Sequence, residues 1–149
     1  MNIGDILITR NADEKDNQSP GYWNHVSIFV GGDNIVEAQS APWSTIKLSE
    51  VDEFFNRYPK IQIYRWKDDD TVGEKAATYA RTMLGKEYKW LASLFYMFRR
   101  GENCVTTVRK AYKEALGFDP GWRKPDDITT DKRLVFITEK NSEEDNGHI

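Results

Sequence analysis

The chain has 149 residues, of which 39% are apolar and 13% aromatic, and its formal net charge is −3. This length suits one domain with a sizeable hydrophobic core, and the slight negative charge without a basic stripe argues against nucleic-acid binding. The one cysteine in the chain excludes an internal disulfide and a cysteine-rich metal site. We therefore expect no metal and no cofactor.

The two ends of the chain predict a cytoplasmic protein with a short polar tail. The N-terminus lacks the charged and apolar regions of a signal peptide. No apolar run approaches the roughly 18 residues of a membrane-spanning helix, so we expect no integral membrane segment. The last residues are polar and acidic, without apolar anchors. We predict one domain over residues 1–138 and a disordered tail over 139–149.

The first half of the chain reads mainly as strands. Apolar and polar residues alternate over 26–30, the glycine-rich turn at 31–34 follows, and a second apolar run covers 35–39. This pattern is typical of a β-hairpin. The other elements predicted here are a strand at 4–9, a loop at 11–20, a strand at 45–48, a helix at 49–55 with Ser49 as N-cap, and a strand at 61–66.

The second half reads mainly as helices. Apolar residues recur at helical spacing along each predicted helix, and Asn103 suits the N-cap of the second one. That position would make Cys104 the first helical residue. The predicted elements are a helix at 71–84 ended by Gly85, an aromatic helical segment at 90–98, a helix at 104–116, an irregular stretch at 120–130 and a strand at 134–137.

Three polar residues stand where they can meet. His25 begins the first hairpin strand, the second strand carries Glu37, and Cys104 begins a helix. A helix N-terminus favours a thiolate, and a cysteine paired with a histidine that a third group orients is the arrangement of cysteine hydrolases. Because the sequence leaves the hairpin register open, either Glu37 or Gln39 can orient His25. Taken singly, a buried cysteine and a hydrogen-bonded structural histidine are the commoner roles.

Several segments together resemble the circularly permuted papain-like family related to NlpC/P60 peptidases, of the YaeF/YiiX type. They are, in chain order, Gly4-Asp5-Ile6-Leu7, Asn24-His25-Val26-Ser27-Ile28-Phe29-Val30-Gly31, Ile35-Val36-Glu37-Ala38, Gly85-Lys86-Glu87-Tyr88, Asn103-Cys104 and Pro125-Asp126-Asp127-Ile128. The resemblance spans residues 3 to about 137. It implies an α+β fold, a small antiparallel sheet or barrel packed against helices, with the cysteine at a helix N-terminus.

The resemblance also implies roles for individual residues. Cys104 would be the nucleophile, His25 the general base and Glu37 the group that orients the histidine. Ser27 stands where the family commonly has glycine. The implied activity is hydrolysis of a small amide or a peptide, such as a cell-wall peptide, through an acyl-enzyme. We expect Tyr22, Trp23 and Asn103 to bind substrate.

Two other functions stay open on the sequence. The Asn-Cys start and the permuted order also resemble lecithin:retinol acyltransferase relatives, which act on lipids. Those relatives usually carry a second histidine where this chain has Glu37, although the segment Trp90–Phe98 would suit an acyl groove. The third possibility is a non-catalytic module that binds a ligand on the same fold.

Overall fold

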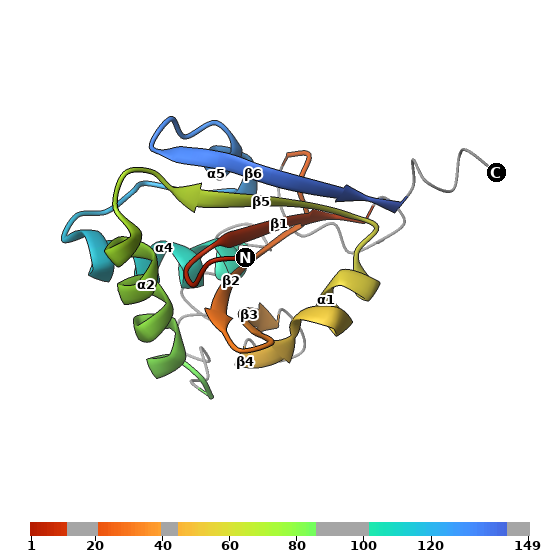
Figure 1. Ribbon diagram of the computed structural model, residues 1–149, viewed down its shortest axis with the longest axis horizontal. Coiled ribbons are helices and arrows are strands. Elements are labelled where there is room, and N and C mark those ends of the chain that lie inside the picture. Colours follow the sequence, from red (N-terminus) through yellow and green to blue (C-terminus); the bar gives the residue numbers. More distant parts are fainter. Residues whose placement is uncertain (12–20, 40–44, 86–101, 143–149) are drawn as a thin grey trace.

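The computed structural model describes residues 1–11, 21–39, 45–85 and 102–142. Within this part of the chain, six antiparallel strands form one sheet in the order β4-β3-β2-β1-β5-β6 (Figure 1). The strands are β1 (Ile6–Arg10), β2 (His25–Gly31), β3 (Asn34–Gln39), β4 (Thr45–Glu50), β5 (Lys60–Trp66) and β6 (Leu134–Asn141). The helices are α1 (Val51–Arg57), α2 (Asp70–Thr82), α4 (Glu102–Leu116) and α5 (Pro125–Thr129). The predicted α+β class agrees with this architecture.

The two faces of the sheet bury two separate hydrophobic clusters. Alternate residues of a strand point to opposite faces, so Val26, Ile28 and Val30 pack with apolar residues of α2 and α4. The other face carries Phe29 of β2, and Phe54 of α1 packs there. Figure 1 shows α2 and α4 on one side of the sheet and α1 at the opposite end of the fold.

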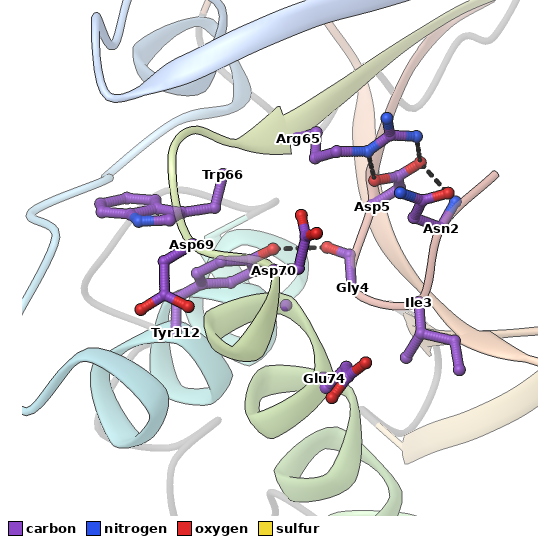
Figure 2. Close-up of a pocket in the computed structure, with 11 residues that line it drawn as sticks. Asn2, Ile3, Gly4, Asp5, Arg65, Trp66, Asp69, Asp70, Glu74 and Tyr112 are labelled. Atoms are coloured by element: carbon purple, nitrogen blue, oxygen red, sulfur yellow. Dashed lines mark hydrogen bonds and ion pairs between the residues drawn. The ribbon is translucent and has the colours of Figure 1, made fainter.

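The N-terminal Gly-Asp pair has a packing role. Gly4 has a φ of +95°, and a Cβ placed on it would lie 2.2 Å from the Cα of Gly73, so α2 can approach only a glycine here. Asp5 is fully buried, and its two carboxylate oxygens accept hydrogen bonds of 2.8 and 2.9 Å from Arg65 of β5 (Figure 2). These contacts fix β1 against β5 and α2.

A cavity of about 220 Å³ lies beside this ion pair. Its walls include Trp66, Asp70, Glu74 and Tyr112 (Figure 2). None of His25, Glu37 and Cys104 lines it, so the predicted chemistry lies elsewhere in the molecule.

The structure corrects the predicted N-cap at Ser49. β4 pairs with β3 as far as Glu50, opposite Asn34, so Ser49 is a strand residue opposite Ile35. The helix α1 begins at Val51, and its N-cap Glu50 makes no side-chain cap hydrogen bond. A serine before an acidic first turn suits an N-cap, but the full β3–β4 pairing decides the outcome here.

The C-terminal region is more regular than the sequence indicates. The stretch 120–130, which we predicted to be irregular, contains α5, where Asp127 accepts hydrogen bonds from the backbone N–H groups of Arg123 and Lys124. β6 runs to Asn141, beyond the predicted end at 137. It pairs with β5 along its whole length, so it takes in residues 139–141, which we assigned to the tail. Residues 143–149 lie outside the described part.

Three predicted segments also fall wholly or mainly outside the described residues. They are the loop at 11–20, of which only Asn11 is described, the connector 85–88 beyond Gly85, and the aromatic segment 90–98. The acyl groove that we considered for Trp90–Phe98 therefore stays a sequence-based prediction.

Candidate active site

The predicted residues come from three different elements. His25 is the first residue of β2, Glu37 lies within β3, and Cys104 is the third residue of α4. The helix begins at Glu102, two residues before the predicted start, so Cys104 is not its first residue. Cys104 still lies in the first turn, where backbone N–H groups lack partners within the helix.

Glu37 contacts the imidazole of His25 directly. The distance between His25 Nε2 and Glu37 Oε1 is 3.0 Å, and the carboxylate side chain is only 2% exposed. β2 and β3 pair with Ile28 opposite Val36. Continuing that register places Glu37 opposite Ser27, as a diagonal neighbour of His25 on the same face. The side chain of Gln39, the alternative partner, lies outside the described residues.

Cys104 interacts with the same imidazole. Burial lowers the pKa of His25, but hydrogen bonds and charge attraction from Cys104 and Glu37 outweigh that effect and raise the pKa to about 9. The side chains are poorly accessible, since Cys104 is 5% exposed and His25 is 14% exposed. Nε2 of the ring contacts Glu37, and the hydrogen bond with Cys104 is made by the same imidazole. Cys104 and Glu37 therefore both interact with the imidazole of His25.

Aromatic side chains hold the imidazole from the α1 side. The ring of Tyr58, the residue after α1, stacks on His25 at a centroid distance of 5.8 Å and an interplanar angle of 17°. Phe54 of α1 lies 6.1 Å from the imidazole, centroid to centroid. These contacts restrict rotation of the ring, so its two nitrogens keep their directions.

Arg57, the last residue of α1, was not predicted as part of the site. Its guanidinium donates to both oxygens of Glu37, at 3.0 Å to Oε1 and 2.6 Å to Oε2. Burial raises the pKa of Glu37, but hydrogen bonds from His25 and Arg57 outweigh it and hold that pKa well below its usual range. Glu37 is therefore ionised at neutral pH. The sequence carries no sign of this pair, because it depends on how α1 packs against β3.

The three predicted substrate-binding residues have different environments. The side chain of Tyr22 is 44% exposed, and its hydroxyl lies 3.0 Å from Lys60 Nζ. Trp23 is 6% exposed and packs in the cluster beneath α2 and α4, which gives it a packing role. The side chain of Asn103 lies outside the described residues. Substrate binding by all three stays a prediction.

The Pro125-Asp126-Asp127 segment contacts the residues that immediately precede His25. Asp126 of α5 accepts hydrogen bonds from the backbone N–H groups of Tyr22 and Trp23, at 3.0 and 3.1 Å. Gly21 allows this approach, since a Cβ there would lie 2.7 Å from the Asp126 carboxylate. The contact anchors the chain at the entry to β2.

The raised pKa of His25 predicts how stability depends on pH. A group whose pKa is higher in the folded state stabilises the fold fully below its unfolded value, here 6.5, and that contribution is lost as pH rises through about 9. We expect the free energy of unfolding to fall between these pH values by at most about 3 kcal/mol. Urea unfolding of the protein and of His25→Gln, across this pH window, measures it. Parallel curves for the two proteins would contradict the assignment.

The described residues contain neither a metal-binding cluster nor a membrane-spanning helix. Within residues 1–11, 21–39, 45–85 and 102–142, no group of three or more His, Cys, Asp and Glu side chains is placed to hold a metal ion. In that same part of the chain, every helix is too short or too polar to cross a membrane.

Comparison with known proteins identifies the family. A family profile, described as permuted papain-like amidase enzyme, YaeF/YiiX, C92 family, matches residues 1–130. Neither a curated protein nor a solved structure matches the chain significantly. The profile covers most of the chain and confirms the YaeF/YiiX resemblance that the sequence motifs predicted. The chain therefore belongs to the YaeF/YiiX, C92 family of permuted papain-like amidases.

Proposed function

We propose that this family member hydrolyses an amide through a covalent acyl-enzyme on Cys104, with His25 as general acid and base and Glu37 orienting the imidazole. The observation that carries the proposal is the line of contacts from Cys104 to His25 to Glu37. A nucleophile, a base and a group that orients the base, each in contact with the next, are the parts that acyl transfer needs.

The pKa of His25 supports a specific starting state. An imidazole that keeps its proton up to about pH 9 is cationic at neutral pH. A thiol attacks a carbonyl as the thiolate, and an imidazolium beside it stabilises that anion. We therefore infer that the imidazolium of His25 stabilises the thiolate that Cys104 forms as it attacks the carbonyl, while Glu37 contacts Nε2 of the ring.

The reaction then follows in two steps. The Cys104 sulfur attacks the amide carbonyl carbon, and the backbone N–H groups of the first turn of α4 stabilise the oxyanion. His25 gives its proton to the leaving nitrogen as the carbon–nitrogen bond breaks, which leaves a thioester. His25 next takes a proton from water, and the resulting hydroxide cleaves the thioester. The products are an amine and a carboxylic acid, and the thiolate is restored.

Alkylation kinetics test the nucleophile without a known substrate. At pH 6–7 a free thiol is only on the order of 1% thiolate, so we expect iodoacetamide to modify Cys104 at least about tenfold faster than it modifies free cysteine. His25→Ala should slow the reaction, while His148→Ala should leave it unchanged. Because the chain has one cysteine, the mass of the intact protein reports this reaction alone. Alkylation at the rate of a free thiol or slower would instead favour a non-catalytic binding module.

A substrate comparison separates the amidase from the lipid enzyme. The protein is incubated with peptidoglycan peptides in one arm and with short-chain acyl esters in the other. Release of amines from the peptides supports the amidase, and a Cys104 adduct formed only with acyl esters supports the lipid alternative. If neither class yields a Cys104 adduct, both forms of the proposal fail.

A further inference from the structure

We propose that Arg57 is a positioning residue of the site, which holds the Glu37 carboxylate against Nε2 of His25. This inference rests on the proposed function for its catalytic consequence, but the geometry behind it is independent of that function. Arg57 touches neither the nucleophile nor the reacting atoms. It acts through Glu37, and the effect reaches Cys104 through His25.

The geometry gives Arg57 control over both carboxylate oxygens. The planar guanidinium binds them in a two-pronged contact, at 3.0 and 2.6 Å. Such a fork fixes the plane of the carboxylate as well as its position. Oε1, the oxygen shared with Arg57, is also the one that contacts His25 Nε2 at 3.0 Å. Rotating Glu37 away from His25 would therefore break the Arg57 pair as well.

Arg57 is itself held in place from its own helix. Its guanidinium lies 5.4 Å from the ring centroids of Phe54 and of Tyr58, and it approaches Glu53, one turn earlier, at 3.5 Å. The same two aromatic rings pack against the imidazole. Residues at the end of α1 therefore hold both the imidazole of His25 and the carboxylate of Glu37.

A competing cation explains why Glu37 needs to be held. Lys47 of β4 lies directly opposite Glu37 in the sheet, and directly opposite residues have Cβ atoms about 5 Å apart on one face. Lys47 can therefore draw the carboxylate away from the imidazole. In the structure the ion pairs of Glu37 within the described residues are with His25 and Arg57. We infer that the Arg57 fork decides this competition.

The test measures the pKa of His25 by NMR in a Cys104→Ser background, which removes the sulfur nucleophile and makes the readout independent of catalysis. The chain has two histidines, so adding His148→Gln leaves one imidazole signal. We expect Arg57→Gln to lower the pKa of His25 by about one pH unit, as Glu37 turns toward Lys47. Arg57→Lys should recover only a minor part of that shift, because it restores the charge but not the fork. Adding Lys47→Gln to Arg57→Gln should also restore part of it.

A matched control variant breaks a similar pair elsewhere. Arg65 binds buried Asp5 through two hydrogen bonds, at 2.8 and 2.9 Å (Figure 2). This pair lies at the start of β1, whereas His25 pairs with Thr9 near its other end. Arg65→Gln should therefore destabilise the fold without moving the pKa of His25. The proposal is overturned if Arg57→Gln leaves that pKa unchanged or raises it, since a merely structural arginine would alter stability alone.

A second readout connects the geometry to the chemistry. With Cys104 present, p-nitrophenyl acetate serves as the acylating probe, and intact mass reports the adduct. We expect Arg57→Gln to slow acylation on the order of 10- to 100-fold, the usual cost of a misplaced catalytic group. Unchanged acylation would overturn the catalytic consequence. If the unmutated protein forms no Cys104 adduct, the proposed function fails, while the pKa measurement still decides the role of Arg57.

Discussion

Cys104→Ala is expected to abolish amide hydrolysis while leaving the fold intact. In the proposed mechanism the Cys104 sulfur forms and breaks the covalent bond to the acyl group, and alanine offers no atom for that step. Loss of one member of a catalytic unit costs on the order of 10⁴- to 10⁶-fold in kcat. The sulfur is small and buried in the cluster beneath α2 and α4, so the free energy of unfolding should change by no more than about 1 kcal/mol.

Hydrolysis rates and urea unfolding curves check this expectation together. Thr106→Ala is the control, because it changes a residue of the same helix only two positions after Cys104. This variant should retain turnover. Turnover that persists in Cys104→Ala would end the assignment of Cys104 as nucleophile. A variant that fails to unfold cooperatively would instead give Cys104 a structural role.

The strand hairpin and the strand order along the chain could be predicted from the sequence. Alternation over Val26 to Val30 and the Gly31–Asn34 turn are local signals, and β2 and β3 formed where these signals lie. The elements that were missed depend on tertiary contacts. Lys140 donates to the backbone carbonyl groups of Phe55 and Tyr58. Lys140 belongs to the last part of β6, and the polar composition of these residues alone indicated a tail.

In the candidate site, too, some residues have a local sequence signal and others depend on tertiary contacts. His25, Glu37 and Cys104 could be proposed as candidates because their residue types are rare or chemically specific and their segments resemble a family. Choosing Glu37 as the partner of His25 needed the register of β2 against β3, which is set by long-range pairing. Arg57 had no local signal at all, since an arginine that ends a short helix is common. Only the packing of α1 beside β3 brings it to Glu37.

Glu37→Gln is expected to damage both stability and catalysis, because one carboxylate serves two partners. The amide keeps the shape of the side chain but loses the charge. In the amide, an NH₂ group replaces one of the two carboxylate oxygens. This donor then faces either Arg57 or the imidazole, so at least one hydrogen bond is lost. Removing one partner of a buried ion pair costs about 3–5 kcal/mol. Arg57 is one-third exposed, which reduces the expected loss to about 2–3 kcal/mol.

The catalytic loss should be larger than that of Arg57→Gln. Replacing the carboxylate that orients a catalytic histidine by its amide lowers kcat by about 10⁴-fold in the serine-protease case, where the imidazole takes the wrong tautomer. The pKa of His25 should fall as well, because Glu37 is one of the two groups that raise it. Rate profiles from pH 5 to 10 and urea unfolding measure both effects, with Glu114→Gln, at an exposed position of α4, as the control. Full kcat in Glu37→Gln would mean that the imidazole is oriented by its stacking on Tyr58 alone.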